Sequence, residues 1–370
     1  MDNLTHTLFG LCLAKAGLER TTPLATATLV ISSNLPDIDI ATRLRGSLTY
    51  LEYHRGITHS FAGLAVLAGV FTLVLAIVDS RYRRRDRFRR PIRPRVVFLL
   101  ACLGGLGHLF MDFTNSYGAR PLLPFSDRWF YGDLVFVADP WIWLILGSAV
   151  VWLTAKGVKR SLGWIVIGSG LALLVGLGFR SPQETPMAIT PLPVPELARV
   201  VWFIGLAAVG IGALLGWGRA GPKVARYSLI FLALYYCGMW RLKQSAQEQA
   251  RNSLPASGAM SVAAWPEPGD PLRWQSVAAF QDSFLARHIT VGRPGADWQE
   301  LSALDARLAA ALRETREGRV FLDFSRYASA TVDEGDDGYA VVLRDLRLPM
   351  RMNVRLNPDM TVRSADFRWF

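Results

Sequence analysis

Residues 61–78 read FAGLAVLAGVFTLVLAIV and contain no charged side chain. An uncharged apolar run of about 18 residues is typical of a helix that crosses a lipid bilayer. The basic stretch RYRRRDRFRR follows at residues 81–90, and further arginines continue to residue 95. Loops rich in arginine stay on the cytoplasmic side of a membrane, so this segment predicts the direction in which the helix crosses.

The rest of the N-terminal 240 residues repeats this pattern and predicts a mainly α, polytopic helical membrane bundle. Hydrophobic residues make up 51% of the 370-residue chain, which favours a membrane protein over a soluble one. The formal net charge of +11 is concentrated in short loops between apolar segments, so it indicates orientation, and no nucleic-acid partner is expected. The predicted spans are 61–78, 96–111, 141–155, 162–179, 201–217 and 227–240.

The basic segment 81–95 also predicts the topology. Counting spans from it places the loops 156–161 and 218–226 in the cytoplasm, and both of these loops carry basic residues. The segments expected on the opposite, extracytoplasmic side are 112–140, 181–195 and everything after residue 240. We therefore expect a multi-pass inner-membrane protein.

Two apolar stretches precede the first span, at residues 4–18 and 24–35. Each is too short to cross a bilayer comfortably, so together they predict a short helical hairpin. If its turn at residues 19–23 points toward the cytoplasm, His6 and the Asp37/Asp39 pair lie at its outer end.

The composition after residue 240 is that of a soluble protein. We expect a linker at 241–261 and a small α+β domain at 262–370. Apolar residues spaced by three and four predict an amphipathic helix over 297–316. The predicted β-rich segments are 319–332, 338–348 and 350–369, with a turn at 333–338.

Four of the five histidines lie in the first 115 residues, beside acidic residues at metal-ligand spacing. Imidazoles and carboxylates are costly beside a bilayer, and they persist mostly where they pair, line a water-filled cavity or bind a metal. We therefore predict a metal site in this region. Its candidate ligands are His6, Asp37, Asp39, His54, His59, His108 and Asp112.

Each part of this set has an alternative interpretation. His108 and Asp112 are four residues apart on one helix face, which suits a shared ion or a hydrogen bond within the helix. Asp37 and Asp39 suit oxygen ligation, the orientation of a ligand imidazole, or a solvated turn. Arg55 could hold a phosphate or carboxylate oxygen, or be an ordinary interfacial arginine.

The order of these motifs resembles that of the YdjM-like family of membrane-bound metal-dependent hydrolases. The motifs are Thr5-His6-x-x-x-Gly10, Leu35-Pro36-Asp37-Ile38-Asp39, His54-Arg55-Gly56-Ile57-Thr58-His59-Ser60 and His108-x-x-x-Asp112. The resemblance covers about the first 115 residues. That family is distantly similar to zinc-dependent phospholipases C and to single-strand-specific zinc nucleases.

The resemblance implies one ion held by Asp37 or Asp39, by His59 or His54, and by the His108/Asp112 pair. It also implies that Asp112 could bridge to a second ion near His6. The downstream histidines that complete a three-metal cluster in the soluble enzymes have no counterpart here, because the remaining histidine is His288. One or two zinc ions are therefore expected, with other divalent metals open.

The resulting hypothesis is a zinc-dependent hydrolase of the phosphoesterase type. Asp37 or Asp39 would act as base or ligand, and Arg55 would assist catalysis. The expected substrate is a phosphoester at the outer face of the membrane, either a phospholipid or a lipid-linked phosphate. Two alternatives stay open: a metal or proton transporter, and a non-catalytic scaffold whose C-terminal domain binds an envelope protein.

Overall fold

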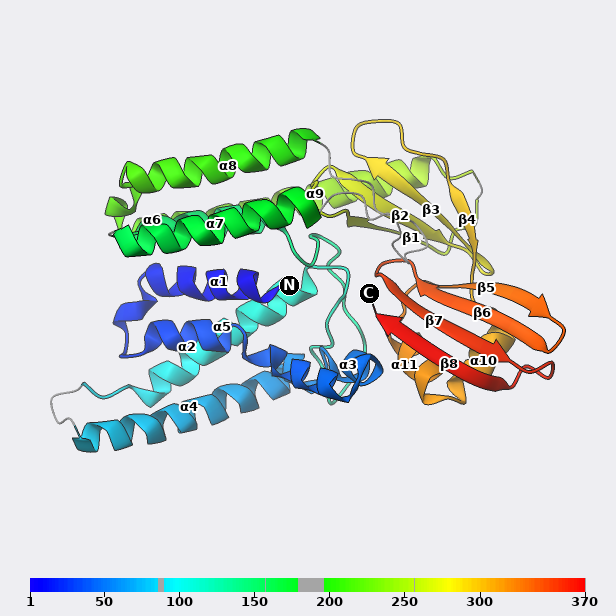
Figure 1. Cartoon of the computed structure of the whole chain (residues 1–370), viewed down its shortest axis with the longest axis horizontal. Coiled ribbons are helices and arrows are strands. Elements are labelled where there is room, and N and C mark those ends of the chain that lie inside the picture. The colour runs from blue at the N-terminus through cyan, green and yellow to red at the C-terminus, as the bar shows by residue number, and fades with distance from the viewer. Residues whose placement is uncertain (86–89, 157, 179–195, 256, 370) are drawn as a thin grey trace. The chain divides into compact units, whose positions relative to one another are not determined.

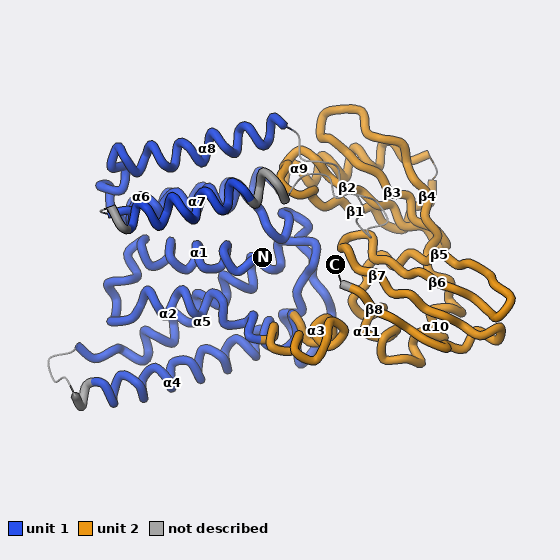
Figure 2. Tube along the Cα trace, in the orientation of Figure 1, with its two compact units in different colours: residues 1–38, 55–180, 194–239 blue, residues 39–54, 181–193, 240–370 orange. Residues whose placement is uncertain are grey.

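The computed structural model describes residues 1–85, 90–156, 158–178, 196–255 and 257–369. It divides into two compact units, one comprising residues 1–38, 55–180 and 194–239 and the other residues 39–54, 181–193 and 240–370 (Figure 2). The first unit is helical and the second contains two antiparallel sheets. The predicted fold class, a mainly α protein with a small C-terminal α+β domain, is confirmed.

The first unit is a bundle of helices (Figure 1). Among the described helices, three are long and apolar enough to cross a membrane, over Phe61–Tyr82, Pro94–Phe113 and Glu196–Leu214. Shorter apolar helices cover Pro140–Thr154 and Arg160–Leu173. The helices are α1 (Asn3–Lys15), α2 (Ala25–Ser32), α4 (Phe61–Arg85), α5 (Pro94–Phe113), α6 (Pro140–Thr154), α7 (Val158–Gly178), α8 (Glu196–Leu214) and α9 (Pro222–Asn252), the last of which continues into the second unit.

Helices α1 and α2 form the expected hairpin, joined through the short 3-10 helix η1 (Leu18–Arg20), and α2 also packs against α5. Glycines allow this close approach. A Cβ on Gly10 would lie 2.8 Å from the carbonyl oxygen of Leu29, and one on Gly104 would lie 2.1 Å from Ser32 Oγ. Small residues of this kind let helix backbones approach closely inside a membrane. The contact brings the C-terminal half of α5 beside the end of α2.

The second unit contains two four-stranded antiparallel sheets, each with its strands in sequence order. Helices α10 (Ala306–Arg313) and α11 (Arg316–Phe324) connect the two sheets along the chain. The first sheet consists of β1 (Ser261–Pro266), β2 (Arg273–Ala279), β3 (Ser283–Thr290) and β4 (Gln299–Ser302). The second consists of β5 (Ala328–Gly335), β6 (Gly338–Asp345), β7 (Met350–Leu356) and β8 (Val362–Trp369).

Some predicted boundaries differ from the observed ones. Helix α9 continues to Asn252, so the first part of the expected linker is helical. The helix predicted over 297–316 is wrong in its first half, because residues 299–302 pair with β3 as an edge strand. The helix begins at Ala306, where the Asp305 carboxylate accepts backbone N–H groups. Residues 319–324, expected to be β, belong instead to α11.

Residues 39–54, which separate two segments of the first unit along the chain, belong to the second unit. This segment contains the 3-10 helix η2 (Leu35–Arg45), which begins in the first unit, and helix α3 (Ser47–Tyr53). Helix α3 packs against α11 and β8. Residues 86–89 of the basic segment and residues 179–195, which include all of the predicted 181–195 connector, lie outside the described residues.

Candidate metal centre

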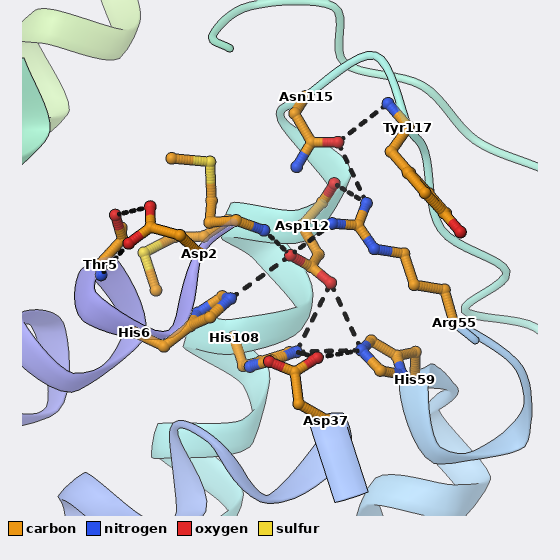
Figure 3. Close-up of polar contacts among 12 residues, drawn as sticks. Asp2, Thr5, His6, Asp37, Arg55, His59, His108, Asp112, Asn115 and Tyr117 are labelled. Atoms are coloured by element: carbon orange, nitrogen blue, oxygen red, sulfur yellow. Dashed lines mark hydrogen bonds and ion pairs between the residues drawn. The ribbon is translucent and has the colours of Figure 1, made fainter. Parts of the chain in front are cut away.

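Helix α5 supplies His108 and Asp112, both of which are buried (Figure 3). His108 Nδ1 lies 2.8 Å from the carbonyl oxygen of Ser33. A carbonyl oxygen can only accept a hydrogen bond, so Nδ1 carries the proton and a neutral ring presents its Nε2 lone pair. In metal-binding histidines, a hydrogen bond from the other ring nitrogen to a backbone carbonyl fixes the tautomer in the same way.

The Nε2 atom of His59 lies at the centre of the cluster. It is 3.1 Å from His108 Nε2, 3.2 Å from Asp37 Oδ1 and 3.4 Å from Asp112 Oδ2. His59 ends the short 3-10 helix η3 (Ile57–His59), and Asp37 lies in the first turn of η2. Two imidazoles and two carboxylates from three distant stretches of sequence therefore point toward one another (Figure 3).

These distances match the spacing of ligands around one metal ion. Donor atoms about 2.0–2.1 Å from a tetrahedral ion lie about 3.3–3.4 Å apart. The His108 Nε2 atom lies 3.6 Å from Asp37 Oδ1 and 3.5 Å from Asp112 Oδ2, and all four donor atoms lie within 4.8 Å of one another. A set of two nitrogens and two oxygens suits zinc and other first-row divalent ions. The four residues could therefore hold a metal ion.

The charges of the cluster agree with that conclusion. Burial opposes the ionisation of Asp37, but the hydrogen bond from His59 and the nearby His108 outweigh it and lower the pKa of the Asp37 carboxyl to about 2. Asp37 is therefore ionised at neutral pH. Two carboxylates in one buried cluster repel each other unless a cation or donor groups compensate them.

Arg55 is a buried residue that holds Asp112 in place. Its guanidinium donates to Asp112 Oδ1 at 2.9 Å, and to the carbonyl oxygens of Gly118 at 2.7 Å and Asp112 at 3.2 Å. It also donates to Asn115 Oδ1 at 3.0 Å and lies over the ring of Tyr117. The sequence left open a phosphate or a carboxylate as the partner of Arg55. In the structure its partner is the Asp112 carboxylate, which Arg55 positions.

His6 lies on the other side of Asp112. Its Nε2 atom is 3.4 Å from Asp112 Oδ1, and its ring stacks on that of His108 with centroids 3.8 Å apart. The Met1 amino group contacts the same Asp112 oxygen. Within the described part of the chain, neither ring nitrogen of His6 makes a hydrogen bond. A buried imidazole whose nitrogens make no hydrogen bond is costly, so His6 fits a further ligand position beside Asp112.

The remaining two candidates, Asp39 and His54, belong to the second unit and pair with each other. His54 Nδ1 lies 2.9 Å from Asp39 Oδ1, and the His54 ring stacks on Tyr50. A carboxylate that orients a ligand imidazole is one of the roles expected for the acidic pair, and this contact has the geometry for it.

The supporting residues around Arg55 were missed in the sequence. Asn115, Tyr117 and Gly118 follow Asp112 directly along the chain and surround the guanidinium. The polar run Thr114-Asn115-Ser116, placed next to a buried apolar helix, was the available signal.

Replacing Arg55 by lysine should weaken metal binding by about 10–100-fold, since a single ammonium group cannot reach Asp112, Asn115 and Gly118 together. Isothermal titration of purified protein with zinc measures the effect. The control is Arg128→Lys, because Arg128 is exposed and lies over Phe130. Equal affinities in the two variants would contradict the positioning role of Arg55.

Comparison with known proteins places the chain in a family. The family model described as "YdjM inner membrane protein" matches residues 1–185, half of the chain. The "Uncharacterized protein YfhP" of Bacillus subtilis (strain 168) is 28% identical over 189 residues, covering 47% of this chain and 54% of that protein. The chain thus spans about half the length of this relative. No solved structure matches significantly. The chain belongs to the YdjM inner membrane protein family.

Proposed function

We propose that this protein is a membrane-bound metal-dependent hydrolase that cleaves a phosphoester. The observation that carries the proposal is the convergence of Asp37, His59, His108 and Asp112, whose donor atoms lie within 4.8 Å of one another. A buried cluster of this composition beside apolar helices is costly unless it has a function. Zinc is the metal we propose, because tetrahedral sites with imidazole and carboxylate ligands suit it.

A divalent ion bound here would supply Lewis acidity toward a phosphoryl oxygen and toward the attacking water. The residues of the chain hold the site ready for that chemistry. His59 and His108 would hold the ion through Nε2, while their Nδ1 atoms contact the Thr58 hydroxyl and the Ser33 carbonyl oxygen. Arg55 keeps the Asp112 carboxylate oriented. We propose Asp39 as general base, because a carboxylate 2.9 Å from His54 forms the type of pair that accepts and passes on a proton.

The position of the cluster along α5 supports a lipid substrate. Helix α5 is long and apolar enough to cross a membrane, and His108 and Asp112 lie in its last two turns. The ends of such helices lie at the level of lipid head groups. We therefore propose a phospholipid or a lipid-linked phosphate as the substrate.

The transporter alternative has less support. A conducting pathway requires polar side chains that continue through the membrane. Residues 62–76 of α4 contain one polar side chain, that of Thr72. Its hydroxyl donates at 2.7 Å to the carbonyl oxygen of Ala68 in the same helix, so α4 does not supply such a pathway. A scaffold without catalytic activity is distinguished from the hydrolase by the following experiment.

Purified protein should release phosphate or a phosphorylated head group from phospholipid vesicles. A chelator or Asp112→Asn should reduce this rate by at least about 100-fold, because the change removes a charged ligand. The matched control is Asp79→Asn, since Asp79 is also a buried carboxylate in a helix but accepts from the Ile92 amide. Chelator-insensitive activity that survives Asp112→Asn would rule out the metal-dependent mechanism, and no activity on any phosphoester would favour the scaffold.

We also propose that the site and the C-terminal domain face the extracytoplasmic side, because of the basic segment after α4. A cysteine at Asp336, in the exposed turn after β5, should react with a membrane-impermeant maleimide on intact cells. A cysteine at Arg90 should react only after the membrane is opened. Both changes are made with Cys102 and Cys237, which are not buried, replaced by serine. The reverse labelling pattern would show that the domain is cytoplasmic.

A further inference from the structure

We propose that the C-terminal domain positions the metal centre by holding α3, with Arg316 and Glu52 as the positioning pair. The inference rests on the metal-binding part of the proposed function and is independent of the substrate. Helix α3 and residues 240–370 belong to the second unit. The metal cluster belongs to the first unit, and two of its residues, Asp37 and His59, flank the 39–54 segment along the chain.

The contact that holds α3 is specific. Arg316 donates to Glu52 Oε2 through two nitrogens, at 2.6 Å and 3.2 Å, and to Thr49 Oγ1 at 3.2 Å. Arg316 is the first residue of α11, whose N-terminus is capped by the Thr315 side chain. The Glu52 carboxylate therefore pairs with a cation at a helix N-terminus, where the helix dipole also favours a negative charge.

Helix α3 needs this support. It has seven residues, and isolated helices of that length are unstable in water. It packs against α11 and β8, and its Leu51 side chain is only 2% exposed. Packing on the C-terminal domain is therefore the main source of order in α3.

The ends of the 39–54 segment connect α3 to the metal centre. The Asp39 and His54 side chains pair at 2.9 Å and so bring the two ends of the segment together. Asp37, a candidate ligand, lies two residues before this pair, and Arg55, which holds Asp112, follows it directly. A displacement of α3 is thus transmitted along the chain to both.

The backbone at Arg55 makes this region sensitive to displacement. Its φ is +55°, in the left-handed region that non-glycine residues rarely adopt. Such a conformation is strained and persists only where its surroundings fix it. The guanidinium contacts fix Arg55 on one side, and the Asp39/His54 pair fixes the preceding residue.

Hydrogen–deuterium exchange of the full chain in detergent tests the proposal. An exposed ion pair contributes little by itself, so the variant must introduce repulsion. Arg316→Glu places two carboxylates opposite each other. We expect faster exchange in α3 and also in residues 35–38 and 55–59. The charge swap Arg316→Glu with Glu52→Arg should restore slow exchange in all three segments.

The matched control is Arg313→Glu, which disrupts the exposed pair of Arg313 with Asp323 in the same domain and should leave these segments unchanged. Zinc affinity gives a second readout, with a loss of about 10-fold expected in Arg316→Glu alone. Three outcomes would overturn the proposal. They are faster exchange confined to α3 and α11, an equal effect in the control, and failure of the charge swap to restore slow exchange. The exchange is measured without added metal, so it tests the coupling between α3 and the cluster residues even if the wild-type protein binds no metal. Absence of metal binding would overturn only the proposed function.

Discussion

The ion pair between Arg55 and Asp112 is the interaction on which the rest of the site depends. The guanidinium fixes one oxygen of Asp112 at 2.9 Å, which leaves the second oxygen 3.4 Å from His59 and 3.5 Å from His108. A buried carboxylate is tolerated only with such compensation, because the loss of its hydration is otherwise too costly. The same pair links α5 to the turn before His59, so it connects ligands from two parts of the sequence.

The helical bundle provides the precision that this pair requires. Small residues let α1, α2 and α5 pack with their backbones close together, and this places the Ser33 carbonyl against His108 Nδ1. The fixed tautomer in turn directs the His108 lone pair into the cluster. Rigid helices thus determine two of the four ligand positions, while η2 and η3 supply Asp37 and His59. The positions of Asp37 and His59 therefore depend on how residues 39–54, which lie between them along the chain, are held.

Sequence patterns predicted much of this organisation and missed specific parts. The helices and the cluster residues followed from apolar run length and from His/Asp spacing, because both patterns are local consequences of membrane burial and helix geometry. The paired role of Asp39 and His54 and the carboxylate partner of Arg55 were open alternatives, since they depend on contacts between distant segments. The edge strand at residues 299–302 is predicted as helix, because Trp298, Leu301 and Leu304 keep a helical spacing of three, and only the pairing with β3 assigns this segment to the sheet.

We propose that Asp37, His59, His108 and Asp112 bind one metal ion together, because their donor atoms lie within 4.8 Å of one another. X-ray absorption spectroscopy of protein loaded with one equivalent of zinc reports the atoms bound to the ion. We expect a shell of four or five nitrogen and oxygen donors at about 2.0–2.1 Å, with scattering from two imidazole rings. That scattering should fall to one ring in His108→Ala. A shell of oxygen donors without imidazole scattering, unchanged by this substitution, would show that these four residues do not bind the ion together.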